Sequence, residues 1–229
     1  LWGVIFSYIE GRKATDFIGA ALAVSFIFSS GFVKSVGAWL MLHVGVPELW
    51  VPFTTGAVFA IPLLLFIYAM EKIPAPSAED IALRMNRVPM SAMERKAFLH
   101  KFLPGIIAAV CIYMFATIFR DIRDNFSADM WKEMGYLNQP AIFSKTETPI
   151  TLIILLLIGS MVLIQNNRKA FMLSHVFIGI GFIIAGFSTY LFTKQLIIPY
   201  WWMTLVGLGL YMVYIPFNSV YFERLIATF

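Results

Sequence analysis

The stretch "MFATIFRDIRDNFSADMW", residues 114–131, decides which fold the chain adopts. An apolar run that starts at Leu103 meets two arginines and two aspartates immediately after Phe119. In one interpretation the helix leaves a membrane near Phe119 and the charges form an exposed turn. In the other, which we favour, the backbone stays helical and carries the charges along one face into a polar space. The four charged residues are Arg120, Asp121, Arg123 and Asp124.

The composition excludes an ordinary soluble domain. Apolar residues make up 60% of the chain and charged residues 13%, whereas soluble domains have roughly 45–50% and about 25%. The sequence therefore predicts an integral membrane protein. The net charge of +4 is modest and lies mostly in short loops, so it indicates topology and no nucleic-acid partner. The single cysteine, Cys111, permits no intrachain disulfide.

Apolar runs of membrane-spanning length recur along the chain, and none alternates with a period of two. They predict an all-α polytopic transmembrane helical bundle with six spans and one partial span. The first residue, Leu1, lies within an apolar pattern, so we expect the chain to be part of a longer protein. The predicted spans are 17–42, 50–70, the run from 103, 149–164, 170–193 and 198–222, with the partial span at 1–9.

Loop charges predict the orientation of the bundle. Alternate loops carry eleven Lys and Arg residues on one side and five on the other, with Lys34 inside a span. The richer side, which includes segment 71–101, is expected to be cytoplasmic. Trp39, Trp50 and Trp201 lie at the opposite side, as aromatic residues do at membrane interfaces. A bacterial inner membrane is the expected location.

Segment 71–101 contains two capping patterns, in which a serine precedes an acidic residue by three positions. Ser77 precedes Asp80, and Ser91 precedes Glu94. We expect two short helices there, with the second lying at the membrane surface. The alternative is a simple tether between two bundles. The two predicted helices are 78–86 and 92–102.

A weak internal repeat predicts two related halves. The segment "SYIEGRKATDF" from Ser7 and the segment "SVYFERLIATF" from Ser219 are identical at four aligned positions after the serine. Both segments follow an apolar span on the predicted cytoplasmic side. Parallel repeats of this kind occur in transporters whose halves are related by an axis along the membrane normal. We expect Glu10, Arg12, Glu223 and Arg224 to form a cytoplasmic gate at these two ends.

On these residues the chain resembles the major facilitator superfamily. The "EGRK" motif at 10–13 looks like the turn between helices four and five of that fold, segment 71–101 like its central loop, and "NNRK" at 166–169 like its turn between helices eight and nine. More narrowly, "YIEGR" and "RDIRDNF" resemble an uncharacterised bacterial family within the superfamily. The resemblance implies the end of helix four through helix ten, with parts of two halves at 1–70 and 103–229 and an interdomain loop at 71–102.

The resemblance also implies that the partial span, the span from 103 and the last span line a central cavity. At 100° per residue, Tyr113, Thr117, Arg120 and Asp124 share one helix face, with Asp121 at its edge. We expect Arg120 to pair with Asp124, four residues away. Arg123 would then remain for an anionic partner, because a guanidinium binds carboxylate or phosphate through two hydrogen bonds.

The last predicted span carries a second polar face, formed by Gly207, Tyr211, Tyr214, Asn218 and Tyr221. Its hydroxyl and amide groups suit either a polar solute or contacts between helices. The residues predicted to bind substrate are Arg120, Asp121, Arg123, Asp124, Tyr211, Tyr214 and Asn218.

Lys34 lies inside an apolar run and is predicted to be an intramembrane charge. A buried ammonium group needs a counter-ion, a cavity or a path to the interface. Lys34 could have a functional role or form a structural ion pair. Its acidic partner could also lie in a part of the protein outside this chain.

The predicted function is secondary active transport of a small polar solute, with an anion favoured by the arginines. The coupling ion of this hypothesis is a proton, taken up at Asp121 or Asp124. No cofactor or metal is predicted, and the partners are the substrate and the lipid bilayer. A non-transporting membrane subunit or receptor with the same fold is the alternative. A membrane-embedded enzyme is less favoured, because His43, His100 and His175 fall in different segments.

Overall fold

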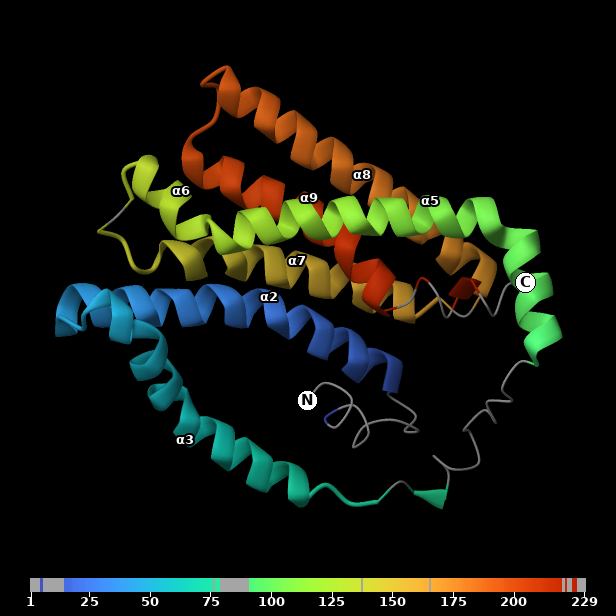
Figure 1. Ribbon diagram of the computed structural model, residues 1–229, viewed down its shortest axis with the longest axis horizontal. Coiled ribbons are helices and arrows are strands. Elements are labelled where there is room, and N and C mark those ends of the chain that lie inside the picture. The colour runs from blue at the N-terminus through green and yellow to red at the C-terminus, as the bar shows by residue number, and fades with distance from the viewer. Residues whose placement is uncertain are drawn as a thin grey trace.

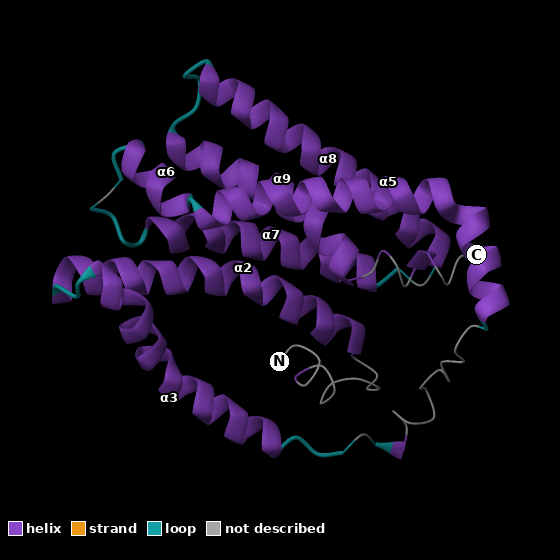
Figure 2. Ribbon diagram, viewed as in Figure 1, coloured by secondary structure: helices purple, strands orange, loops and turns teal. Residues whose placement is uncertain are grey.

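The computed structural model of the protein describes residues 5, 15–75, 77–78, 91–136, 138–164, 166–219, 221 and 224–225. All regular structure within these ranges is helical (Figure 2), which confirms the predicted all-α class. The partial span predicted at 1–9 lies outside them, apart from Ile5. The elements are α2 (Thr15–Trp39), η1 (Leu40–Val44), η2 (Glu48–Trp50), α3 (Val51–Glu71), α5 (Ala92–Asn125), α6 (Ser127–Glu133), α7 (Ile142–Val162), α8 (Asn167–Thr193) and α9 (Pro199–Ser219).

Six helical segments in the described ranges are long and apolar enough to cross a membrane, so the protein is an integral membrane protein. Their ends agree with those of the predicted spans to within about three residues, except that two begin much earlier. The segment around α5 starts at Ala92 and not near Leu103, and α7 starts at Ile142 and not at Pro149. Both extensions bring polar residues into a spanning helix. Hydropathy alone assigns these residues to loops.

Helix α5 begins at the predicted cap. The Ser91 backbone N–H donates to Glu94 Oε2 at 2.8 Å, and the Glu94 N–H donates to Ser91 Oγ at 3.3 Å. The prediction of a separate helix at 92–102 is wrong, because α5 runs unbroken to Asn125. Its first part bends sharply (Figure 1), and Pro104 lies in this part; proline lacks the N–H needed for a straight helix. The helix predicted at 78–86 lies outside the described residues, apart from Ala78.

Helix α9 is the centre of the bundle and packs against α2, α5, α7 and α8 (Figure 1). One apolar core joins α2, α7 and α9, where Ile27, Ile154 and Met212 are buried. A second core joins α5, α8 and α9 around Ala116 and Val213. A mostly apolar helix surrounded by others suits α9, since its apolar side chains are covered on several faces.

Helix α3 diverges from the bundle after its first turns (Figure 1). Thr55 is its buried residue, and its apolar side chains, such as Leu64 and Phe66, are exposed all round. A helix that is apolar on every face and has few protein neighbours is suited to contact with lipid.

The connections gather at two ends of the bundle. The turn between η1 and α3, helix α6 and the link from α8 to α9 lie at one end, here called the α6 end (Figure 1). Two glycines make this end compact, because Gly45 and Gly135 have φ values of 78° and 86°, which suit glycine. The start of α8 and the start of α5 lie at the opposite end, which includes the predicted cytoplasmic segments.

Helices α8 and α9 approach closely at a pair of glycines. A Cβ atom on Gly181 would lie 2.5 Å from the Gly209 carbonyl oxygen and 3.0 Å from the Cβ of Met212. Small residues permit this approach, which provides the van der Waals packing that holds membrane helices together.

Gly181→Ala is therefore expected to lower the stability by roughly 1–3 kcal/mol, because the methyl group must displace the α9 backbone. The control is Gly179→Ala in the same helix, where a Cβ atom meets nothing within 4 Å. That change should be neutral or slightly stabilising, since alanine favours helix. Thermal unfolding of the purified variants measures both, and equal midpoints would contradict the close contact.

Candidate functional site

The charged run after Phe119 lies on a helix, as the favoured interpretation predicted. Helix α5 continues through Arg120 and Arg123 to Asn125, and α6 follows after Phe126. The run therefore stays within the bundle and does not form a turn at its surface. Its side chains divide into two groups, one buried among four helices and one on a partly exposed face.

Arg123 is the centre of the buried group and is only 4% exposed. Its Nη2 forms an ion pair with Glu147 Oε1 on α7 at 2.8 Å. Its Nε and Nη2 also donate to the Met203 carbonyl on α9, at 3.2 and 3.0 Å. A Cβ atom on Gly207 would lie 2.5 Å from the guanidinium carbon, so glycine makes the room that Arg123 occupies. Arg123 is thus held by protein groups, so the expectation that it is left without a partner inside the protein is wrong.

Asp124 links this pair to two further helices. Its Oδ2 accepts a hydrogen bond from the Tyr211 hydroxyl on α9 at 3.0 Å, and its Oδ1 lies 3.4 Å from Arg123 Nη1. Its backbone carbonyl accepts from Lys34 Nζ on α2 at 2.7 Å. The last carbonyls of a helix have no partner within the helix and attract a cation, so Lys34 caps α5. Its partner lies within this chain.

We call Lys34, Arg123, Asp124, Glu147 and Tyr211 the charged cluster. Two basic and two acidic side chains from α2, α5 and α7 balance in formal charge, and Tyr211 adds a hydroxyl from α9. Glu147 Oε2 is buried and has no hydrogen-bond partner among the described residues. The cluster satisfies nearly every group it buries, as burial in an apolar bundle requires.

Glu147 is the residue that sequence reasoning missed. It precedes the predicted span at 149–164, whereas in the structure it is the sixth residue of α7 and only 7% exposed. A Cβ atom on Gly31 would lie 2.7 Å from the Cβ of Glu147, so α2 passes directly over it. One turn earlier, Ser144 Oγ donates to Ser35 Oγ at 2.7 Å. The sequence signal that could have identified it is its position directly before a long apolar run, where a helix can extend to include it.

The second group forms what we call the polar stripe, made of Tyr113, Arg120, Asp121, Tyr214 and Asn218. The Arg120 guanidinium pairs with Asp121 at 2.5 Å and lies 4.2 Å from the centre of the Tyr214 ring. The predicted pair with Asp124 is not formed. The Tyr113 hydroxyl donates to Asn218 Oδ1 at 3.2 Å. The side chains of Arg120 and Asp121 are 23% and 48% exposed, so this face is accessible.

The seven predicted substrate residues therefore fall into two adjoining sets. Arg123, Asp124 and Tyr211 belong to the charged cluster, and the other four belong to the polar stripe. Of the predicted gate, Arg224 donates to Asn167 Oδ1 at 2.5 Å, while Glu10, Arg12 and Glu223 lie outside the described residues. In the part of the chain that the structure describes, no three His, Cys, Asp or Glu side chains gather as metal ligands.

Glu147→Ala is expected to lower the free energy of unfolding by about 3–5 kcal/mol, because it leaves Arg123 buried without its counter-ion. The double variant Arg123→Met with Glu147→Met should lose much less, since neither charge then remains. The exposed Asp129→Ala change is the control. Chemical unfolding in detergent measures all three, and a double variant that loses as much stability as Glu147→Ala would contradict the pairing.

The chain belongs to a family of unknown function, DUF5690, which matches residues 1–229. Comparison with curated proteins gave no significant match. Comparison with solved structures gave none either.

Proposed function

We propose that this member of the DUF5690 family is a secondary active transporter with a fold like that of the major facilitator superfamily. It carries a small polar, anionic solute across the bacterial cytoplasmic membrane by alternating access. The observation that supports the proposal is the charged cluster. Ionised side chains within membrane-spanning helices are rare and usually belong to solute or ion pathways.

The depth of the cluster supports this proposal. Lys34 lies ten residues before Val44, where the first described spanning segment ends. At 1.5 Å per residue this is about 15 Å from the α6 end of that helix. The hydrocarbon core of a bilayer is about 30 Å thick. Lys34 therefore lies well inside a spanning segment, and the buried charges of Arg123 and Glu147 depend on partners within the protein.

The cluster also crosses the boundary between the two predicted halves. Lys34, Gly31 and Ser35 precede the interdomain segment, whereas Asp124, Glu147 and their helices follow it. Their contacts hold α2 against α5 and α7. Alternating access moves one half against the other, so contacts of this kind must break and re-form in each cycle. A polar, hydrogen-bonded contact can exchange partners in this way.

Arg120 is the group best placed to bind an anion. Its side chain is 23% exposed, and its Nε is buried without a hydrogen-bond partner among the described residues. Stacking on Tyr214 fixes the plane of the guanidinium, and Asn218 and Tyr113 add neutral polar groups beside it. Arg120 thus takes the role that the sequence suggested for Arg123. Asp121, the more exposed of the two predicted proton carriers, is its neighbour.

One observation favours the alternative, a non-transporting subunit with a transporter-like fold. Every nitrogen of the Arg123 guanidinium has an acceptor within the protein. A permanently closed structural core would look the same in this conformation. Flux is the property that separates the two functions.

Uptake of radiolabelled carboxylates and phosphate esters into proteoliposomes tests the proposal. Arg120→Gln is expected to raise the KM for the transported anion about 10–100-fold, because a hydrogen bond to a charged group contributes about 1.5–3 kcal/mol. The control, Arg95→Gln, changes an exposed arginine of the same helix outside the stripe and should leave uptake unchanged. An unaltered KM in Arg120→Gln would remove Arg120 from the site. Absence of flux for every anion with folded wild-type protein would favour the alternative.

A further inference from the structure

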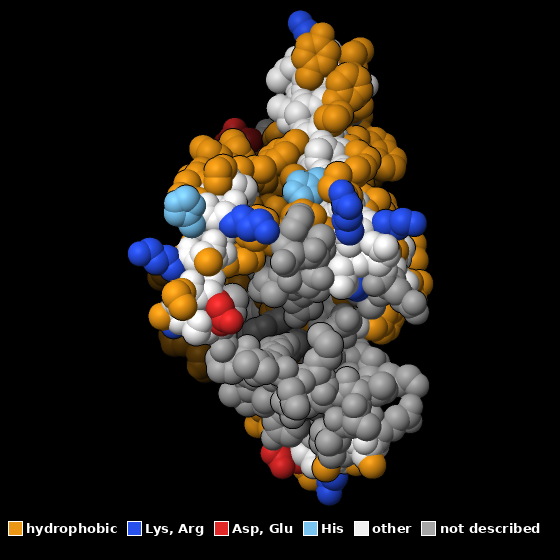
Figure 3. All heavy atoms as spheres, turned by 90° about the vertical axis from the view of Figure 1, so that its right-hand side faces the viewer, with side chains coloured by type: hydrophobic (Ala, Val, Ile, Leu, Met, Phe, Trp, Pro, Cys, Tyr) orange, Lys and Arg blue, Asp and Glu red, His pale blue; other side chains and the backbone are white. Residues whose placement is uncertain are grey.

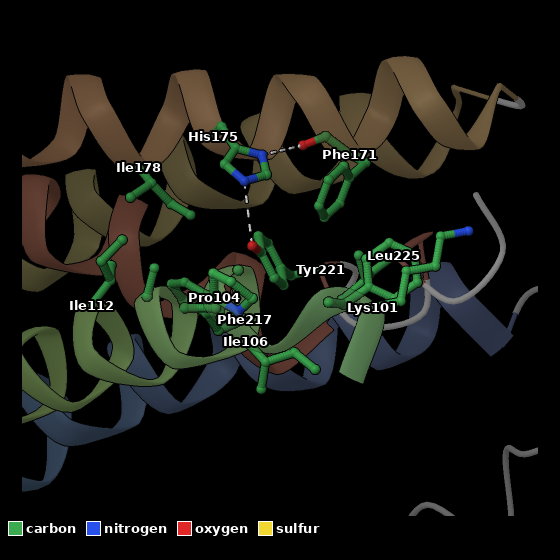
Figure 4. A pocket seen from close by; sticks show the side chains of 14 residues that line it. Lys101, Pro104, Ile106, Ile112, Phe171, His175, Ile178, Phe217, Tyr221 and Leu225 are labelled. Carbon is green, nitrogen blue, oxygen red and sulfur yellow. Dashed lines mark hydrogen bonds between the residues drawn. The ribbon is translucent and has the colours of Figure 1, made fainter. Parts of the chain in front are cut away.

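A cavity of about 470 Å³ lies at the end of the bundle opposite α6, between α5 and α8 with α9 as its floor (Figure 4). We call it the α5–α8 groove. Apolar side chains from three helices line it, among them Pro104, Ile112, Phe171, Ile178 and Phe217. It shares no residue with the charged cluster or the polar stripe.

His175 and Tyr221, the neutral polar side chains that line the groove, bond to each other. His175 Nδ1 lies 2.9 Å from the Phe171 carbonyl oxygen, which can only accept, so Nδ1 carries the proton. His175 Nε2 then accepts from the Tyr221 hydroxyl at 3.3 Å (Figure 4). These bonds direct the polar atoms toward the protein, and the wall of the groove is mostly hydrocarbon. A polar solute would find few partners there, whereas an apolar chain would fit.

The length of the groove matches one leaflet of a bilayer. On α5 it runs from Lys101 to Ile112, which are eleven positions apart, or at most about 16 Å along the helix. That is about half of the 30 Å hydrocarbon core. Lys101, at the outer end, is exposed, so its ammonium group lies where lipid headgroups are expected while Ile112 lies toward the middle of the membrane.

Basic side chains gather around this end. Arg95, Lys96 and Lys101 on α5 and Arg168 and Lys169 on α8 are all exposed, and Figure 3 shows Lys and Arg side chains among apolar ones on this face. Glu94 is an acidic neighbour, but its carboxylate caps the Ser91 N–H. Basic residues between membrane helices attract phosphate-bearing headgroups.

We propose that the α5–α8 groove binds an acyl chain of an anionic phospholipid, whose phosphate faces Lys101. The apolar wall holds the chain, and the basic rim selects the headgroup. The groove contains none of the residues proposed for transport, so its test does not rest on that activity. A lipid held between α5 and α8 fills a space that these helices leave open, and so supports the bent first part of α5.

Native mass spectrometry tests this proposal on the full chain, reconstituted with equal amounts of phosphatidylglycerol and phosphatidylcholine and then extracted in mild detergent. The wild type is expected to retain a bound phospholipid, enriched in phosphatidylglycerol. Gly105→Leu should reduce the retained lipid roughly tenfold or more, because leucine displaces several methylene groups that each contribute about fourfold in affinity. A Cβ atom on Gly105 meets nothing within 4 Å, so the new side chain enters the groove without a backbone clash.

Two further variants complete the test. Gly186→Leu is the matched control, since its Cβ atom also meets nothing within 4 Å and it lies outside the groove; its lipid content should equal that of the wild type. Lys101→Gln should keep a bound lipid but lose its preference for phosphatidylglycerol severalfold. Equal lipid content in wild type and Gly105→Leu, or none in the wild type, would overturn the proposal. A wild-type dimer that Gly105→Leu dissociates would also overturn it and assign the groove to a second copy.

Discussion

The buried pair of Arg123 and Glu147 is the constraint around which the α6 end of the bundle is built. Removing an ion from water costs several kcal/mol even after relaxation, so each buried charge must find partners within the protein. The neighbouring helices are shaped to supply them. Helix α9 gives the Met203 carbonyl and leaves space at Gly207, and α2 passes over the pair with a glycine, Gly31. Helices α2 and α9 thus each carry a glycine where they contact the pair. Because a larger side chain would clash there, these glycines fix the register of α2 and α9 against α5 and α7.

The sequence was sufficient for the six spans found in the described residues, because hydropathy and length depend on local composition. It also predicted that α5 continues past Phe119, since polar residues recur there at helical spacing. It did not reveal the partners of the charges. Glu147 is 24 residues from Arg123 in a segment that reads as a loop, and the partner of Lys34 is a backbone carbonyl, which no residue type identifies. Such partners are set by helix packing, which is a tertiary property.

Competition for partners explains why the local spacing rule failed at Arg120. Residues four apart on a helix are neighbours, so pairing with Asp124 was reasonable in an isolated helix. In the bundle, the Asp124 carboxylate already accepts from Tyr211 and lies beside Arg123. Arg120 therefore turns to the adjacent Asp121 and to the Tyr214 ring. The same competition leaves Arg120 more accessible than Arg123. For this reason we propose Arg120, and not Arg123, as the anion contact.

Stability does not explain why the charged cluster exists. Replacing a buried ion pair by apolar side chains of similar volume is often neutral or stabilising, and the cores around Ile154 and Val213 show that these helices pack well with apolar residues. A membrane bundle built only for stability would extend those cores to Glu147 and Lys34. Hydrogen-bonded charges differ from apolar contacts in being directional and able to exchange partners. A cluster of this kind between α2 and the later helices suits the transport proposed above, in which two halves move against each other.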